Sequence, residues 1–351
     1  MKRLILAGFL ICLLLISLVS CKQKQYNEAL DLIEQGQIEA AYAMLGEMGD
    51  YRKAQELLTH FYKVPVRVIK DQGHNVVTVE YAYGEDSLLR QIAYKHSDGY
   101  NATEDYTFDS DGNLTQYLHT DQEGTRIIRD YAYDANGNML RKTVTSPDGS
   151  KGITTCTYDA SNRLTRETFW HEQGEQSAID YIYDGNGYLL RRIYSDAPSE
   201  ESYAYDGDGN LIKRVHTHYD GGKDVYEYTY DGDGNMLREM ITYADGETVR
   251  REFTYDADGG IVREDYADSY GGKILREYTY DADGRLLLNM NTGSQGKQSG
   301  HAYTYDADGN VIRYVYTAFN GYVETREYEY RLVYIPEKMP QGMKEALDLR
   351  T

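Results

Sequence analysis

The chain has 351 residues, of which 57 are acidic and 37 are basic, so its formal charge is −20 at pH 7. The negative electrostatic field of such a chain repels the phosphate backbone of nucleic acids, which excludes nucleic acid as a natural partner. The 37 tyrosines suit half-buried, pleated surfaces and favour β structure.

Residues 1–20 have the three-part plan of a secretory signal. Basic Lys2 and Arg3 precede an apolar run from Leu4 to Ile16, and small residues follow before Cys21. The apolar run is shorter than the ~20 residues that cross a bilayer, so we expect a cleaved leader rather than a membrane span. Without the leader the formal charge becomes −22, because two basic residues are removed.

The residues Leu18-Val19-Ser20-Cys21 resemble the lipobox of bacterial lipoproteins. The resemblance implies that Cys21 is acylated, for example by palmitate, and becomes the first residue. Each buried CH₂ of an acyl chain contributes ~0.8 kcal/mol, so we expect a lipid-anchored protein on the extracytoplasmic face of the cell membrane. The alternative is an ordinary leader with an incidental cysteine. Cys12 leaves with the leader, so Cys156 has no partner for an intrachain disulfide.

Residues 21–63 are predicted to form a lipidated N-terminus and a short helical neck. Apolar residues recur at helical spacing, and glycines interrupt them, which predicts helices over 26–35, 37–48 and 51–62, with Pro65 at the boundary. The segment resembles a tetratricopeptide-type helical pair, but it occurs only once. A spacer or cap for the following domain is therefore favoured over a protein-binding array.

Residues 64–335 contain a repeated phrase: an aromatic residue, any residue, Tyr or Phe, Asp, two residues and Gly. Successive phrases are 25 residues apart, with one step of 22. The first aromatic positions form a predicted structural ladder: Tyr106, Tyr131, Tyr181, Tyr203, Tyr228, Tyr278 and Tyr303. Cys156 occupies one of these positions, and we expect it to be a small core substitution. The tail is predicted to be 336–351.

A second glycine turn lies between consecutive phrases, for example at Asp148-Gly149 and Asn320-Gly321. Two turns per repeat predict two strands, and tight turns require neighbouring strands to be antiparallel. The fold class is therefore mainly β: a hairpin meander of about eleven 25-residue repeats and about 22 strands after a small α-helical segment. Because sheets twist, we expect it to be twisted, coiled or partly closed.

The strand after each first turn begins with an aliphatic residue and carries a basic residue two positions later, as in Met236 and Arg238. Repetition would align these basic residues in a column. We expect this column to lie beside the ladder tyrosines, where guanidinium groups can stack on the rings.

The recurring Tyr-x-Tyr-Asp-x-x-Gly phrase over residues 81–331 resembles the YD repeats of the bacterial Rhs family. The resemblance implies a spiralling antiparallel sheet at the cell surface, which in some relatives is a closed shell around a toxin and in others a surface for adhesion or carbohydrate binding. Only residues 332–351 follow the last repeat, so a toxin domain is not expected.

The residues that could form metal or catalytic sites also have structural explanations. Paired aspartates such as Asp306 and Asp308 suggest calcium, but hydrogen bonding within the turn explains them better. His216 and His218 share a strand face without a third ligand at useful spacing. The carboxylates are copies of one another, which argues against a unique catalytic pair. We therefore expect no enzyme activity, no metal and no cofactor.

Aromatic residues near the second turns form a candidate ligand-binding rim: Trp170, Tyr219, Tyr243, Tyr270 and Phe319. Sugar rings stack on such platforms, although neighbouring hairpins also pack in this way. The sequence favours a membrane-anchored binding or adhesion surface for a glycan or protein partner. The alternative is a purely structural rod or shell associated with the cell envelope.

Overall fold

The computed structural model describes residues 22–49, 51–84, 87–171, 174, 176–195 and 199–334. The predicted leader, Cys21 and the tail 336–351 lie outside these residues. No helix in the described ranges is long and apolar enough to cross a membrane.

The neck consists of helical residues 22–34, α2 (Ile38–Glu47) and α3 (Arg52–Leu58). Gly36 and Gly49 lie between the helices with φ of 73° and 59°, a conformation that favours glycine. The buried side chains recur at helical spacing and pack into one cluster, namely Ala29, Ala41, Leu45, Met48, Ala54, Leu57 and Phe61. The predicted helices of the neck are confirmed.

The predicted length of the third helix is wrong. The third helix ends at Leu58, not at Tyr62, and the first strand starts at Phe61. Pro65 lies within that strand, at an irregularity of the ladder where a proline is tolerated. Residues 61–65 form a strand because they pair with residues 330–334, far away in the sequence.

The described residues contain 22 strands of similar length. Their bounds are β1 (Phe61–Asp71), β2 (Val76–Tyr83), β3 (Leu89–His96), β4 (Asn101–Phe108), β5 (Leu114–Asp121), β6 (Arg126–Tyr133), β7 (Met139–Thr145), β8 (Lys151–Tyr158), β9 (Leu164–His171), β10 (Gln176–Tyr183), β11 (Leu189–Tyr194), β12 (Ser199–Tyr205), β13 (Leu211–Thr217), β14 (Lys223–Tyr230), β15 (Met236–Thr242), β16 (Thr248–Tyr255), β17 (Ile261–Asp268), β18 (Lys273–Tyr280), β19 (Leu286–Gly293), β20 (Gln298–Tyr305), β21 (Val311–Thr317) and β22 (Val323–Tyr334).

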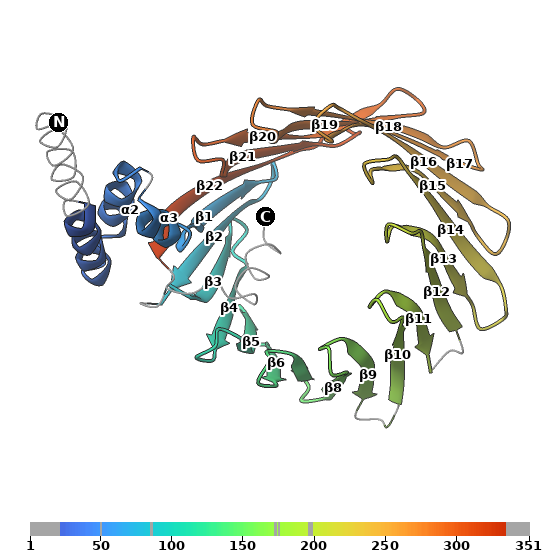
Figure 1. Cartoon of the computed structure of the whole chain (residues 1–351), viewed down its shortest axis with the longest axis horizontal. Coiled ribbons are helices and arrows are strands. Elements are labelled where there is room, and N and C mark those ends of the chain that lie inside the picture. Colours follow the sequence, from blue (N-terminus) through green and yellow to red (C-terminus); the bar gives the residue numbers. More distant parts are fainter. Residues whose placement is uncertain are drawn as a thin grey trace, which may run out of the picture.

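Each strand pairs antiparallel with the next strand in the chain, as β1 does with β2, which confirms the predicted meander. In addition, β1 pairs with β22 over ten residue pairs, from Phe61–Tyr334 to Asp71–Thr325. The prediction of a twisted, coiled or partly closed sheet is therefore wrong on one point, because the sheet closes fully. Figure 1 shows the resulting ring, with the neck helices beside β1 and β22. Closure leaves neither end strand as an open edge.

A β-bulge occurs in every hairpin that carries a Tyr-Asp phrase. In the β14–β15 hairpin, Tyr230 lies opposite Met236 and Thr229 lies opposite Arg238, so Leu237 is an extra residue. A bulge bends the strand and increases its twist. We infer that the same bend, repeated at each hairpin, returns the sheet to its starting strand.

The two kinds of turn lie on opposite edges of the ring, because neighbouring strands run in opposite directions. We call the edge with the Tyr-Asp turns the first-turn rim and the other edge the second-turn rim. Both β1 and β22 meet the neck at the first-turn rim, since Phe61 pairs with Tyr334 there.

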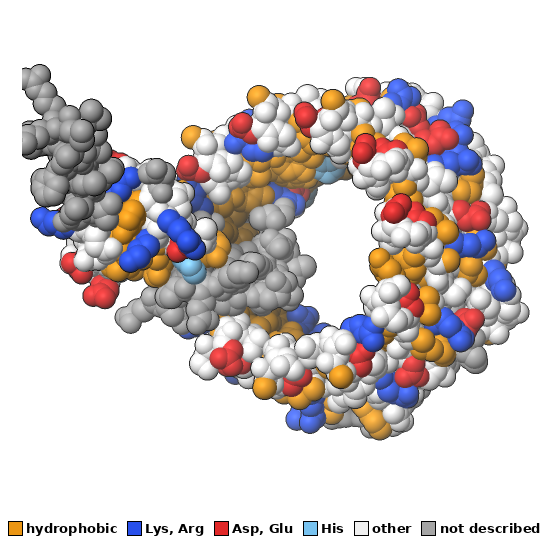
Figure 2. Space-filling view, viewed as in Figure 1, with side chains coloured by type: hydrophobic (Ala, Val, Ile, Leu, Met, Phe, Trp, Pro, Cys, Tyr) orange, Lys and Arg blue, Asp and Glu red, His pale blue; other side chains and the backbone are white. Residues whose placement is uncertain are grey.

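The ladder tyrosines face the inside of the ring. Tyr226, Tyr228 and Tyr230 are half-buried, whereas the alternating Glu227 and Thr229 are exposed. Side chains converge on the concave face of a closed sheet, so the less exposed face is the inner one. Figure 2 shows hydrophobic side chains, in orange, along the wall of the central opening.

Candidate functional site

The second tyrosine of each phrase bridges neighbouring repeats. The Tyr230 hydroxyl donates a hydrogen bond of 2.8 Å to the backbone carbonyl of Leu211, in the preceding repeat. Burial raises the pKa of Tyr230, which keeps its hydroxyl protonated as a donor. Equivalent bonds of 2.7 to 3.0 Å are made by Tyr133, Tyr158, Tyr183, Tyr205, Tyr255, Tyr280, Tyr305 and Tyr330.

An equivalent bond joins the first two strands, next to the place where the ring closes. The Tyr83 hydroxyl donates to the Pro65 carbonyl at 2.6 Å, which ties β2 to β1. Lys63 adds an ion pair to the last first turn, with Nζ at 3.1 Å from Asp306 Oδ2 and in contact with Asp308. We call the β1–β22 ladder, together with the ion pairs of Lys63, the seam.

The aspartate of each phrase organises its own turn. The Asp231 carboxylate accepts hydrogen bonds from the backbone N–H of Asp233 and from both the backbone and side-chain N–H groups of Asn235, at 2.9 to 3.0 Å. Hydrogen bonds from Asn235 hold the pKa of Asp231 below its usual value. The carboxylate oxygens are thus used within the turn, as the turn-bonding interpretation requires.

The two paired histidines each contact a carboxylate. His218 Nε2 lies 3.0 Å from Asp224 Oδ2, and His216 Nδ1 lies 3.7 Å from Glu201 Oε1. Across the described parts of the chain, no group of three or more His, Cys, Asp and Glu side chains is placed to hold a metal ion.

The predicted column of basic residues lies on the wrong face for stacking on the ladder. Arg238, Arg191 and Lys213 are exposed and point outward, because the bulge inserts one residue and reverses the alternation. On the outer face they pair with acids of the next strand, as Lys213 does with Glu227 at 3.2 Å. The expectation of ring stacking by this column is therefore wrong.

Stacking on tyrosines comes instead from arginines at other positions. The Arg214 guanidinium carbon lies 3.8 Å from the centroid of the Tyr226 ring, and that of Arg192 lies 5.5 Å from the Tyr181 ring. Arg214 and Arg192 follow the first aliphatic residue of their strands by three positions. The sequence pattern would have predicted that these arginines face the tyrosines only if it had included the bulge.

Buried glutamates join these arginines on the inner face. Glu264 is 6% exposed and contacts the guanidinium of Arg276, and Tyr278 donates to its other oxygen at 3.3 Å. Glu201 is 8% exposed and contacts Arg192 at 3.5 Å. The wall is therefore charged and hydrogen-bonded over this part of the ring, and each buried carboxylate is paired.

Cys156 is buried against the wall, with 4% of its surface exposed, and its Sγ lies 4.0 Å from Glu167 Oε1. Burial raises the pKa of the Cys156 thiol. This confirms the prediction that it substitutes for a ladder tyrosine as a small core residue.

The candidate rim residues all belong to the second-turn rim, but they do not converge on one pocket. Tyr219 and Tyr270 are each 76% exposed at turn tips, and Phe319 and Trp170 are 45% and 44% exposed. Tyr243 is only partly exposed. Four of the five lie near alternate second turns, so their spacing along the rim is about 19 Å for four strands.

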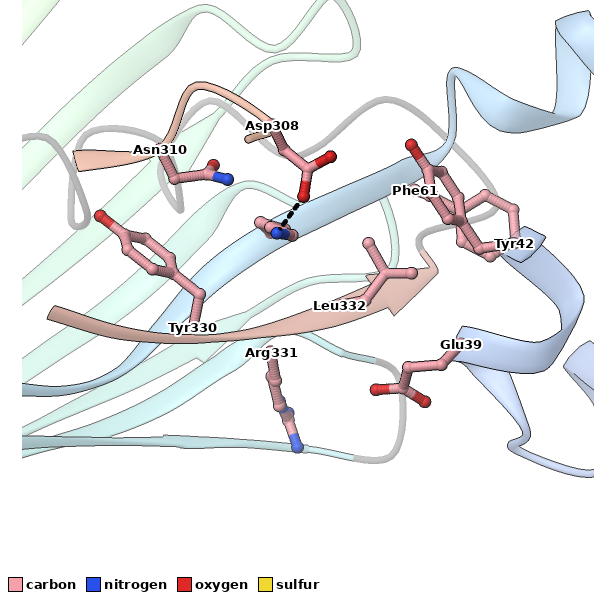
Figure 3. A pocket seen from close by; sticks show the side chains of 9 residues that line it. Glu39, Tyr42, Phe61, Asp308, Asn310, Tyr330, Arg331 and Leu332 are labelled. Atoms are coloured by element: carbon pink, nitrogen blue, oxygen red, sulfur yellow. Dashed lines mark hydrogen bonds and ion pairs between the residues drawn. The ribbon is translucent and has the colours of Figure 1, made fainter. Parts of the chain in front are cut away.

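A pocket of about 560 Å³ lies where the neck meets the first-turn rim. Figure 3 shows Glu39 and Tyr42 of α2 facing Leu332 of β22, with Asp308 and Asn310 on the opposite side. Lys63, Phe61 and the last residues of β22 complete the lining. The residues that line this pocket are far apart in the sequence, so no local sequence motif predicts it.

The family model described as Teneurin YD-shell matches residues 17–236. No curated protein matches the chain. Among solved structures, the chain is similar to the Tc holotoxin pore of Photorhabdus luminescens, at 15% identity and a TM-score of 0.41, over 73% of this chain and 16% of that one. A porin-like protein from Bacteroides uniformis matches at 12% identity and a TM-score of 0.29, over 78% of this chain and 97% of that one. The chain spans 19% or less of the Tc toxin chains that it matches.

Proposed function

This chain belongs to the Teneurin YD-shell family, and from that premise we propose that it is a structural shell element of the cell envelope. In this proposal a lipid on Cys21 holds the ring at the extracytoplasmic face of the cell membrane. The shell role, which was the alternative at the level of sequence, is preferred over the binding surface.

The closed sheet is the observation that carries this proposal. The ladder between β1 and β22 leaves no end strand unpaired. A closed sheet of this kind separates an inner wall from an outer surface, which an open sheet cannot do. The inner wall carries paired arginines and glutamates with tyrosines, and the proposal assigns it no catalysis.

The position of the neck sets the orientation of the ring in this proposal. The neck meets the ring at the first-turn rim, through the contacts of Phe61, Leu332 and Tyr334. A lipid on Cys21 would therefore hold the first-turn rim toward the membrane and present the second-turn rim outward.

A labelling experiment on residues 22–351 tests the shell. In a Cys156→Ser background, a cysteine replaces either inner-face Asn289 or outer-face Thr229. Both should react with a small maleimide, whereas a maleimide carried on a protein-sized polymer should label only Thr229→Cys. Equal polymer labelling of the two variants would show that the inner wall is not shielded.

The anchor has its own test. Metabolic labelling with an alkyne fatty acid should mark the wild-type protein, and fractionation should place it with membranes. Cys21→Ser should abolish both the label and the membrane association, whereas Cys12→Ser should change neither. An unlabelled wild-type protein would contradict lipidation.

A binding role remains a second candidate because Tyr219 and Tyr270 are each 76% exposed at the rim that would face outward. Rings exposed to this degree contribute nothing to packing and suit contact with a neutral glycan or a protein. Binding on a glycan array should be lost in Tyr219→Ala/Tyr270→Ala and in Trp170→Ala. Tyr188→Ala, which removes a 39% exposed ring from the opposite rim, should bind normally. If the wild-type protein bound no glycan on the array, a glycan would be excluded as the ligand.

A further inference from the structure

The second-turn rim between β13 and β22 carries exposed aromatic rings at every other turn. Tyr219 and Tyr270 are each 76% exposed and Phe319 is 45% exposed, in the first, third and fifth turns of this stretch. Tyr243, at the base of the second turn, is only partly exposed. The second and fourth turns expose small or polar residues, namely Ala244, Asp245, Ser294 and Gln295. We call this stretch of five turns the aromatic arc.

The charge of the aromatic arc differs from that of the opposite rim. The five second turns between β13 and β22 contain three acidic residues and one basic residue, namely Asp220, Asp245, Glu247 and Lys297. The five first turns between β12 and β21 contain ten aspartates and one arginine. Two copies of the chain therefore repel each other strongly through their first-turn rims but only weakly through the aromatic arc.

The alternation of its turns makes the aromatic arc complementary to itself. Neighbouring second turns are about 10 Å apart, which is two strand spacings and leaves room for a ring between two tips. A twofold axis between the third and fourth turns reverses the order of the turns in the second copy. It places Tyr270 of one copy opposite Gln295 of the other, and Phe319 opposite Ala244. Each exposed ring then meets a turn that has no aromatic residue at its tip.

The same arrangement keeps like charges apart. The turn with Asp245 and Glu247 faces the turn of Phe319, which contains no charged residue. The turn of Tyr219 and Asp220 faces the turn between β1 and β2, which contains no acidic residue. The two central turns, which face each other, contain no acidic residue either. An acidic turn of one copy is therefore never opposite an acidic turn of the other copy along the arc.

We propose that the aromatic arc is the interface of a homodimer, in which two rings meet rim to rim and Tyr219, Tyr270 and Phe319 of each copy lie between turns of the other. Tyrosine and phenylalanine are enriched at protein interfaces, where each ring buries a large area. The neck meets the opposite rim and stays outside this interface. Two rings joined in this way surround one longer central opening. The inference depends neither on the lipid anchor nor on the shell function.

Sedimentation velocity of the full chain, in a density-matched detergent, measures the association. The wild type should sediment as a dimer. Tyr270→Ser/Phe319→Ser should raise the dissociation constant by about a hundredfold or more, because the dimer loses four buried rings. Leu190→Ser/Leu237→Ser changes side chains that are 36% and 41% exposed near the first turns, and should leave the dimer unchanged. A wild type that sediments as a monomer would overturn the proposal.

A substitution that adds a ring separates interlocking turns from general adhesion between exposed aromatic residues. Gln295→Trp fills the turn that faces Tyr270 of the other copy. Interlocking predicts that the dissociation constant rises by about tenfold or more, because two rings then compete for one space. Glu123→Trp, at an exposed second turn outside the aromatic arc, should have no effect. Unchanged or tighter association of Gln295→Trp would contradict the proposed interface.

Discussion

At the scale of single residues, the two tyrosines of each phrase have different roles. Tyr228, in the ladder position, packs on the inner face, whereas Tyr230 donates a hydrogen bond to the preceding repeat. The phrase is therefore a connection between hairpins as well as a turn signal. The sequence could predict the turn chemistry of Asp231, because an aspartate before a glycine turn accepts bonds locally. It could not predict the face of Arg238, because one bulge residue reverses the alternation.

Removing one bridging hydroxyl should weaken the ring without altering its shape. Tyr230→Phe loses the bond to Leu211 and should lower the free energy of unfolding by about 1 kcal/mol. Tyr219→Phe removes a hydroxyl from a ring that is 76% exposed and should have no measurable effect. Urea denaturation followed by circular dichroism measures both, and equal effects would refute the bridging role.

The seam aspartate should make stability sensitive to acid. Burial opposes ionisation of Asp306, but hydrogen bonds from Asn310 and Lys63 outweigh it and lower its pKa to about 2. The pKa of an aspartate in the unfolded chain is ~3.9, so as the pH falls the unfolded chain takes up this proton first. The stabilisation is therefore complete above about pH 4 and is lost as the pH falls toward about 2.

Urea titrations between pH 5 and pH 2 would measure this loss. Asp306→Asn should show a shallower decline of unfolding free energy than the wild type, since the ionising group is gone. Asn310→Ala removes a donor and should move the decline to higher pH. Parallel curves for all three proteins would mean that Asp306 does not contribute.

At the scale of elements, spacing was enough to predict the helices and hairpins but not where the third helix ends. The segment 59–65 lacks a strong helix stop, and its strand conformation depends on pairing with β22, more than 250 residues later. Local sequence patterns cannot reveal a pairing partner at this distance in the chain. The neck pocket was missed for the same reason, because Lys63 and Asp308 meet only once the ring closes.

The packing of the neck against the sheet is open to a direct test. Leu45 is fully buried in the cluster that joins α2 to Phe61. Leu45→Ala should cost about 3 kcal/mol locally and speed proteolysis and hydrogen exchange over 38–58. Leu237→Ala, at an outer position that is 41% exposed, should leave the neck unchanged. A neck equally protected in both variants would contradict this packing.

At the scale of the whole molecule, the sheet joins its own ends. The sequence shows how many strands there are and that they run antiparallel, but closure depends on the sum of small bends at each bulge. The total bend over all the hairpins cannot be derived from the sequence of one repeat. The sequence is therefore equally compatible with a coiled or partly closed sheet. The rim aromatics illustrate the same limit: their shared edge was predictable from the turns, whereas their wide spacing follows from the size of the ring.

The claim that the ring is closed can be tested most directly at the seam. Arg67 and Glu329 are paired across β1 and β22 and are 43% and 60% exposed on the outer face. In a Cys156→Ser background, Arg67→Cys/Glu329→Cys should form a disulfide within one monomer under mild oxidation, visible by mass spectrometry. Arg67→Cys/Thr229→Cys, with the second cysteine on a distant strand, should form none. A 67–329 pair that stays reduced, or that links only separate copies, would show that the sheet is open.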